Sequence, residues 1–478
     1  MNTPTALLVG ISLATVGLLT RGAPDEGPYE AVVVGDDAHN WLSRAEAAAD
    51  LRAWQSAVLE LHPAMQDPRA RAVFAQRVDA LIASLPEVVA RARLHKKWAA
   101  VAAAFGDSHT AVLPTVDMAV HDPLPIVADG RRLCLAKPYR SAPTGACFTR
   151  FGTRTAASAI EWIDTVTPHE SEDSWRVMAP SLLPFALAEL GVPADATAVL
   201  EDADGAWFEV ALPAMGTMPK PNPLDALNLR IDAHGIAHIT LRTMVGSHQA
   251  HFQKAFERMF ATLAQNPPRG IVVDVRGNDG GSTTVGDQLL AYLTKTPYRM
   301  MAQKHWRVSA AMQARIRQHG GGFENYLAAS VGSTLPMEVS ELPPSGAPFA
   351  YTGPVVFLAD HRTRSAAMMM LDAVKTYRLG LIIGEAPASP PNYFGEVYSY
   401  TASHTGFRVS ISTAAFVRAN GNASDGSGVA PDLPVATTLE DRVAGRDPVR
   451  ARAIAAVEYW HEVRREAATS KAVDEAVE

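Results

Sequence analysis

Gly270-Ile-Val-Val-Asp-Val-Arg276, followed by Gly277-Asn-Asp-Gly280-Gly281, is the stretch that decides the fold. Its first part is a nearly continuous apolar run, which is typical of a strand buried on both faces of a parallel sheet. Glycines follow it directly, and they let backbone N–H groups approach a ligand closely. The stretch therefore predicts a buried strand that ends in a turn able to bind phosphate or to form an oxyanion hole. A plain tight turn is the alternative for this segment taken alone.

Two further segments repeat the pattern of a buried strand beside a helix. Val355–Ala359 is fully apolar and leads directly into a helical stretch at Ser365–Thr376, and Leu379–Gly384 is a third apolar strand. Strands of this kind that alternate with helices are typical of a parallel sheet covered on both faces. We therefore expect residues 226–436 to form an α/β core that opens with a hairpin at 227–241.

The chain before and after this core divides into units of different composition. Residues 40–114 keep helical apolar spacing, and Ser43 with Glu46 three residues later forms a capping-box pattern. Residues 115–217 instead carry several short apolar strands and one helical stretch, which predicts a β-rich module. Residues 437–478 predict a C-terminal helix and tail. The fold class expected is a multidomain α/β chain.

Prolines mark several boundaries within and between these units. His62-Pro63 ends the first helix, because the residue before proline disfavours helical geometry, and Pro68–Leu85 and Pro86–Phe105 fit two further helices. Alternating prolines at 218–223 favour an extended linker before the core. Beyond the core, Glu440–Ala467 fits a single closing helix.

Composition excludes several classes of protein. The chain has 478 residues with 47% apolar and 19% charged side chains, which excludes wholesale disorder. A net charge of −7 argues against nucleic acid as the main partner. Two cysteines are too few for a disulfide scaffold or for a metal cluster held by cysteine.

The N-terminus carries a pattern typical of export. Residues 2–20 are uncharged, and the apolar part at 6–19 is shorter than the ~20 residues that a membrane-spanning helix needs. We expect residues 1–24 to be a signal peptide or a short membrane anchor, and the protein to be periplasmic or extracellular. A packed or disordered N-terminal segment is the alternative.

Cys134 and Cys147 flank a turn-rich segment, so an exported chain could join them in a disulfide; two buried thiols are the alternative.

Two polar side chains are candidates for catalysis. Ser365 lies at the first turn of a helix after a buried strand, at the sheet edge where sites cluster, although it could simply cap that helix. His109 lies between hydroxyl and carboxylate side chains in Gly106-Asp-Ser-His-Thr110, which makes it a plausible general base. A lone histidine is more often a surface or core residue.

Metal ligands in a known pattern are not evident. His248 and His251 lie three residues apart, and His234 and His238 lie four apart, but no third ligand completes either pair in the sequence. A phosphate-binding Gly-Lys-Ser/Thr motif is also missing from the sequence. We therefore expect neither a metal nor an organic cofactor.

Several motifs, taken in order, resemble peptidase family S41, which includes the tail-specific proteases and the tricorn core. The matching segments, over about residues 40–435, are His62-Pro63, Gly106-Asp-Ser-His-Thr110, Ile271-Val-Val-Asp-Val-Arg-Gly-Asn-Asp-Gly-Gly281, Thr363-Arg-Ser-Ala-Ala367, Gly384-Glu385 and Gly428-Val-Ala-Pro-Asp432. The resemblance implies an N-terminal helical unit, a PDZ-like module and an α/β core similar to those of ClpP and crotonase. In the loop after Glu385 this chain departs from the family, because it has Ala386-Pro-Ala-Ser-Pro-Pro391.

The family carries two catalytic arrangements, and the sequence favours one of them. A Ser–Lys dyad would place lysine about 25 residues after the serine, where this chain has Pro390, and Lys375 lies mid-helix. The resemblance to the tricorn-like branch implies Ser365 as nucleophile and His109 as general base. In that branch a hydroxyl and a carboxylate complete the relay, which corresponds here to Ser108 and Asp425.

The resemblance also implies the oxyanion hole and the reaction. The amide of Ala366 and one from Gly280 or Gly281 would bind the tetrahedral oxyanion. The expected activity is hydrolysis of peptides or unfolded proteins through an acyl-enzyme. A ligand-binding protein without catalysis, built on the same scaffold, is the alternative function. The sequence indicates neither the substrate sequence nor the oligomeric state.

Overall fold

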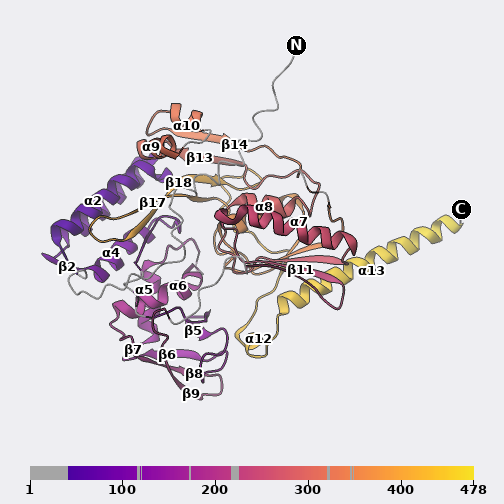
Figure 1. Ribbon diagram of the computed structural model, residues 1–478, viewed down its shortest axis with the longest axis horizontal. Helices are drawn as coiled ribbons and strands as arrows, with labels where there is room; N and C mark the ends of the chain where they lie inside the picture. Colours follow the sequence, from indigo (N-terminus) through magenta and orange to yellow (C-terminus); the bar gives the residue numbers. More distant parts are fainter. Residues whose placement is uncertain are drawn as a thin grey trace, which may run out of the picture.

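The computed structural model contains an N-terminal helical unit, a β-rich module and an α/β core, which pack against one another (Figure 1). The residues it describes are 41–115, 119, 121–171, 174–216, 226–319, 323–344, 347 and 349–477. The expected leader at 1–24 and the expected linker at 218–223 lie outside the described residues. None of the helices in the described ranges has the length and apolar character needed to cross a membrane.

The N-terminal unit is helical, as predicted, with a small two-stranded sheet at its base. Its elements are β1 (Trp41–Ser43), α2 (Arg44–Leu61), η2 (Pro63–Gln66), α3 (Pro68–Ala83), β2 (Val88–Ala90) and α4 (Arg91–Ala103). The capping box of Ser43 and Glu46 is formed at the start of α2. The expected helix start at Pro86 is wrong, because the β-branched pair Val88-Val89 pairs with β1 first.

The core contains a six-stranded sheet in the order β10-β11-β12-β15-β16-β19. Its strands are β10 (Leu227–Ile231), β11 (Ile236–Leu241), β12 (Gly270–Asp274), β15 (Val355–Ala359), β16 (Leu381–Gly384) and β19 (Leu433–Pro434). The expected hairpin of β10 and β11 is antiparallel, and the remaining pairs are parallel. The buried parallel sheet predicted from the apolar runs is therefore confirmed.

Helices cover both faces of this sheet. Those that pack on it are α7 (Gln249–Gln265), α8 (Thr283–Leu290), α11 (Ser365–Tyr377) and α13 (Pro448–Val477). The other helices after the β-rich module are α9 (Ala310–His319), α10 (Glu324–Ala328) and α12 (Leu439–Val443). Ile271 and Val273 of β12 pack in the cluster formed with α7, α8 and α11, whereas Val272 packs against α13. This alternation explains why the strand is apolar at consecutive positions.

A second sheet, which the sequence did not predict, joins the core to the helical unit. Its strands are β13 (Gln303–Arg307), β14 (Thr334–Glu338), β17 (Tyr393–Thr401), β18 (Arg408–Val417) and β3 (Ala111–Leu113). The short strand β3 follows directly after the helical unit and pairs antiparallel with β18. Side chains of α2 and α4 pack against this sheet in one cluster that includes Trp54, Trp98 and Phe407.

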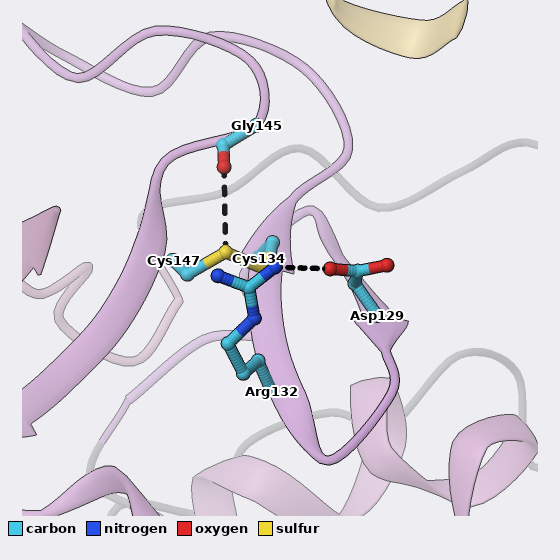
Figure 2. Close-up of a disulfide and its surroundings, with 5 residues drawn as sticks. All are labelled: Asp129, Arg132, Cys134, Gly145 and Cys147. Carbon is cyan, nitrogen blue, oxygen red and sulfur yellow. Dashed lines mark hydrogen bonds and ion pairs between the residues drawn. A yellow bond between two sulfur atoms is a disulfide. The ribbon is translucent and has the colours of Figure 1, made fainter. Parts of the chain in front are cut away.

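The β-rich module has its own sheet, in the order β4-β5-β6-β8-β9. Its elements are β4 (Ile126–Asp129), β5 (Arg132–Leu135), β6 (Cys147–Phe151), β7 (Arg154–Thr155), α5 (Ala156–Val166), α6 (Ser174–Glu189), β8 (Thr197–Glu201) and β9 (Trp207–Ala211). Cys134 and Cys147 are directly opposite each other on β5 and β6 and form a disulfide (Figure 2). The PDZ-like character of this module stays a prediction.

The expected single closing helix is wrong in one respect. The chain forms the short α12 and the long α13 instead, with Gly445 at positive φ between them and Pro448 at the start of α13. Proline fits the first turn of a helix but not its interior, so the segment divides there. The division lets α12 pack on the β-rich module, where a Cβ at Gly145 would lie 2.4 Å from the Cγ2 atom of Val443.

Candidate active site

Ser365 is the first residue of α11 and lies just past the carboxyl end of β15. It has a positive φ of 48°, a left-handed conformation that non-glycine residues rarely adopt. The N-cap is Arg364 rather than Ser365, so the simple capping role considered for this serine is not the one it has. Hydrogen bonds hold the turn: the Arg364 amide donates to the Asn278 carbonyl at 2.8 Å, and the Thr363 hydroxyl donates to the Val275 carbonyl at 3.0 Å.

The glycine turn after β12 lies against the candidate nucleophile. A Cβ atom at Gly280 would lie 2.7 Å from the Ser365 Cβ and 2.8 Å from the Ala366 amide nitrogen. Gly280 also has a φ of 93°, so both its conformation and its surroundings require glycine. The two segments that the sequence placed at separate strand ends are therefore in contact.

Three backbone amides were expected as oxyanion donors, and they differ in their present partners. The Gly280 amide donates to the Asn278 side-chain oxygen at 2.8 Å, so this donor is already engaged. The amides of Gly281 and Ala366 have no acceptor among the hydrogen bonds of the described residues. Gly281 stays close to Met244, whose backbone pairs with both of its neighbours, Gly280 and Ser282. Ala366 and Gly281 thus form the available donor pair.

His109 lies in the turn between α4 and β3, and pairing with β18 holds that turn. The Ser410 hydroxyl donates to the His109 carbonyl at 2.9 Å, and the Ser412 amide donates to the Thr110 hydroxyl at 3.0 Å. The imidazole ring is partly exposed, with 24% of the side-chain surface accessible. The histidine is therefore fixed by its backbone while its ring stays partly accessible to solvent.

The carboxylate beside His109 is Asp107, which is only 2% exposed. One of its oxygens accepts the His109 amide at 2.9 Å and lies 3.7 Å from His109 Nδ1. The other oxygen lies 3.2 Å from His62 Nε2 and accepts the Ser412 hydroxyl at 2.7 Å. Burial alone would raise the pKa of Asp107, but the contacts with His109 and His62 outweigh burial and hold that pKa well below its ordinary value. An ionised carboxylate therefore faces the imidazole.

Asp425 and Ser108, the relay residues expected from the resemblance, are placed differently. The Asp425 carboxylate pairs with Arg418 and accepts hydrogen bonds from the amide and hydroxyl of Ser427. The Ser108 hydroxyl is buried and has no hydrogen-bond partner among the described residues. Asp107 is therefore the carboxylate beside His109, where the resemblance to the tricorn-like branch implied Ser108 and Asp425.

Tyr393, at the start of β17, connects the two candidate catalytic residues. Its ring lies 5.4 Å from the His109 ring, centroid to centroid. Its hydroxyl lies beside the Ser365 side chain and donates to the Met369 sulfur at 3.0 Å. Burial is the main cause that raises the pKa of this phenol, so the hydroxyl stays protonated. Ser365 and His109, which are far apart in sequence, thus meet around one side chain.

A second carboxylate reaches the site from the β-rich module. Glu170 accepts the Ser108 amide at 2.7 Å with one oxygen and the Ser389 hydroxyl with the other. Single ligand atoms of Asp107, His109 and Glu170 lie within 4.8 Å of one another. Both Asp107 oxygens are already engaged by His62, Ser412 and the His109 backbone, so the donor set suits orientation of the histidine better than capture of a metal ion.

The sequence reasoning missed three of these side chains for different reasons. Asp107 stood in the quoted motif and was recognised as a neighbour of His109, but no pattern distinguished it from Ser108. Glu170 and Tyr393 carry no local signal, since each lies in an irregular segment or at a strand start. Cys134 and Cys147 lie in the β-rich module, where their disulfide closes a hairpin.

Comparison with known proteins adds a family and a fold. Residues 235–435 match the model of peptidase family S41. The crystal structure of mature CPAF superposes with a TM-score of 0.61 at 14% identity, covering 84% of this chain and 95% of that one. The structure of mature CPAF complexed with lactacystin superposes with a TM-score of 0.59 at 14% identity, covering 89% of this chain and 98% of that one. A sequence search of curated proteins gave no match. At this identity the structural likeness shows the fold, and the expected fold class is confirmed.

Proposed function

We propose that the protein is a serine peptidase in which Ser365 and His109 carry catalysis through an acyl-enzyme, because residues 235–435 match the model of peptidase family S41. The observation that carries this proposal is the cluster around Tyr393. That side chain touches both Ser365 and His109, and the buried, ionised Asp107 lies behind the imidazole. A nucleophile, a base and an orienting carboxylate are the parts that a serine hydrolase needs.

In the proposed reaction, His109 accepts a proton and then returns it in each of the two steps, acylation and deacylation. The Ser365 hydroxyl turns from Tyr393 towards His109, loses its proton to the imidazole and attacks the scissile carbonyl carbon. His109 then gives that proton to the leaving amine as the C–N bond breaks, which leaves an ester on Ser365. Water attacks this ester with His109 again as base, and His109 returns that proton to the Ser365 oxygen as the ester bond breaks and the acid product leaves. The Asp107 carboxylate, 3.7 Å from Nδ1 of His109, stabilises the positive charge on the imidazole throughout.

The tetrahedral intermediate needs two donors for its oxyanion. Ala366 is the second residue of α11, so its amide points out of the helix N-terminus, where developing negative charge is stabilised. Gly281 supplies the second amide, and its φ of 136° is a conformation that favours glycine. The absence of an internal acceptor for either amide among the described residues supports this pair over Gly280.

Two substitutions test the proposal directly. Ser365→Ala and His109→Ala should each lower kcat for a denatured protein substrate such as casein by about 10⁴-fold or more. Circular dichroism should show an unchanged fold, and Ser424→Ala, in an exposed loop, should keep full activity. Full activity of Ser365→Ala would refute the mechanism. A folded wild-type protein that neither cleaves peptides nor reacts with a fluorophosphonate would favour the ligand-binding alternative.

The substrate class follows from the family, and one similar structure suggests a probe. We propose peptides and unfolded proteins as substrates, because an extended chain can reach a serine at the edge of a sheet. Lactacystin is present in the complex with mature CPAF. We expect lactacystin to modify Ser365 in this chain as well, and mass spectrometry of the treated protein should find the adduct on that residue only.

We also propose that the protein works outside the cytoplasm. The disulfide of Cys134 and Cys147 supports this location, because disulfides persist mainly in oxidising compartments. The uncharged, apolar N-terminal segment points the same way. Fractionation of expressing cells should find the protein in the exported fraction.

A further inference from the structure

A polar cavity of about 670 Å³ lies where the core, the β-rich module and the C-terminal helices meet. It shares two segments with the candidate active site: residues 359–362 lead into Ser365, and Gly277 opens the turn that ends at Gly281. The edge strand β4 and helix α6 form its wall on the β-rich side, and the segment from α12 to α13 forms the wall opposite. The cavity is therefore within a few residues' reach of the nucleophile.

Positive side chains dominate this cavity although the whole chain is acidic. Seven arginines line it against three carboxylates, Asp360, Glu385 and Asp447. Three further carboxylates, Asp274, Glu440 and Asp441, pair with lining arginines from outside the lining, so one positive charge is in excess. The chain as a whole has a net charge of −7. A local charge of the opposite sign concentrates anionic groups at the cavity.

Part of this positive charge has a structural use. Asp274, which is 1% exposed, accepts hydrogen bonds from Arg242 and Arg276. Asp447 pairs with Arg276 and Arg450, which ties the start of α13 to the core. Burial raises the pKa of Asp274, but the two arginines outweigh burial and hold that pKa well below its ordinary value. Arg446 pairs with Glu440 and Asp441, so these four arginines face four carboxylates and their charges balance.

Two other arginines have no such partner. Arg362 follows β15, and its Nε atom is buried without a hydrogen-bond acceptor in the described structure. Arg442 lies in the last turn of α12, and no ion pair of its side chain occurs among the described residues. A buried N–H group without an acceptor, such as the Nε of Arg362, is unfavourable, so an acceptor supplied by a ligand would stabilise it.

Resting on the proposed peptidase function, we propose that this cavity binds carboxylate groups of the substrate, with Arg362 and Arg442 as the ligands of the anion. The planar guanidinium matches a carboxylate in two parallel hydrogen bonds. The volume admits several residues of an extended peptide rather than a single small anion. The enzyme therefore prefers substrates with acidic residues, or with a free C-terminus, a few residues from the cleaved bond.

The experiment compares matched peptides. A quenched fluorescent peptide that the enzyme cleaves, taken from a casein digest, is made with Glu-Glu or Gln-Gln at one end, each as free acid and as C-terminal amide. Wild-type enzyme should cleave the Glu-Glu peptide with a kcat/KM about tenfold higher than the Gln-Gln peptide, or the free acid with a kcat/KM about tenfold higher than the amide. Salt at 0.3 M should reduce the ratio that is observed. The Glu-Glu arm reports side-chain carboxylates, and the free-acid arm reports the terminal carboxylate.

Variants then assign the preference to the cavity. Arg442→Gln and the double variant with Arg362→Gln should bring the ratio of acidic to neutral kcat/KM towards one. Arg452→Gln, an exposed arginine of α13 outside the cavity, should leave the ratio unchanged. A wild-type ratio near one, or a ratio unaltered in the double variant, would overturn the inference while the peptidase function stands.

A binding arm separates this inference from the proposed function. Fluorescence anisotropy with the full-length Ser365→Ala protein measures the affinity for labelled Glu-Glu and Gln-Gln peptides without cleavage. Tighter binding of the acidic peptide, lost in the Arg442→Gln background, supports the cavity even if wild-type protein cleaves nothing. Equal binding of both peptides would overturn it.

Discussion

Ser365 and His109 reach the same site by different physical means. Ser365 is positioned by its backbone, because a buried strand, a left-handed φ and the contact with Gly280 leave its turn little freedom. His109 is positioned by side chains and by one short strand pairing, through Asp107, Ser410 and Tyr393. The comparison teaches that the position of the proposed nucleophile depends on local chain geometry, whereas the position of the proposed base depends on how two units dock.

Substitution of Asp107 is the strongest way to break the base side of this comparison. Asp107→Asn should lower kcat by about 10³–10⁴-fold, because the amide no longer holds the imidazole in the reactive tautomer. Asp425→Asn is the matched control, and it should change kcat less than about threefold because the Asp425 carboxylate contacts Arg418 and Ser427 instead. Steady-state kinetics on one peptide measures both. A larger loss in Asp425→Asn than in Asp107→Asn would return the relay to Asp425.

Substitution of Gly280 tests how the glycine turn positions Ser365. Gly280→Ala should lower kcat/KM by about 10²-fold, because the new methyl group would push Ser365 and the Ala366 amide out of place. Gly277→Ala is the control: it also has a positive φ, of 69°, but nothing lies within 4 Å of its would-be Cβ. Kinetics combined with thermal unfolding separates displacement from instability. Equal losses in both variants would mean that backbone strain alone is responsible.

Acid should destabilise the helical unit that carries His109 before it destabilises the core that carries Ser365. We expect this effect to be smaller than those of the two substitutions above. Burial is the main cause that lowers the pKa of His95 in α4 from 6.5 to about 4; its bond to the Val112 carbonyl opposes this, and the charge of Arg91 adds to it. The unfolded chain therefore takes up a proton near pH 6.5 that the folded chain refuses until about pH 4. Stability from neutral His95 is present above that window and is lost as pH falls through it, by about 3 kcal/mol at most.

Urea unfolding between pH 4 and pH 7.5 measures this loss. His95→Gln cannot titrate, so its free energy of unfolding should depend less on pH in that window than that of the wild-type protein. Hydrogen exchange should show α4 opening at acid pH while β12 stays protected. Parallel pH profiles for the two proteins would show that His95 is not the group responsible.

Local pattern was enough to predict much of the core. The apolar runs of β12, β15 and β16 predicted strands buried on both faces, and the glycine turn and Ser365 were recognised at their ends. Pro390, where a lysine dyad would need its lysine, removed one catalytic arrangement. These features depend on periodicity, glycine and proline, which act over a few residues and can be read along the chain.

Other elements gave no such signal. The second sheet was missed because strands such as β17 are half-exposed and mix polar with apolar residues, which is also typical of loops. The closing helix was drawn as one element because helical periodicity hides a break unless Gly445 and Pro448 are given enough weight. In both cases tertiary packing outweighs local preference.

By itself, the sequence determined the candidate nucleophile Ser365 and its turn, because backbone geometry there follows from neighbouring residues. Only the tertiary structure decided the partners of the base: Asp107 rather than Asp425 beside His109, Tyr393 between base and nucleophile, and Glu170 from another unit. Such contacts join side chains that are hundreds of residues apart. No spacing along the chain records them, because they form only when β3 pairs with β18 and the units pack together.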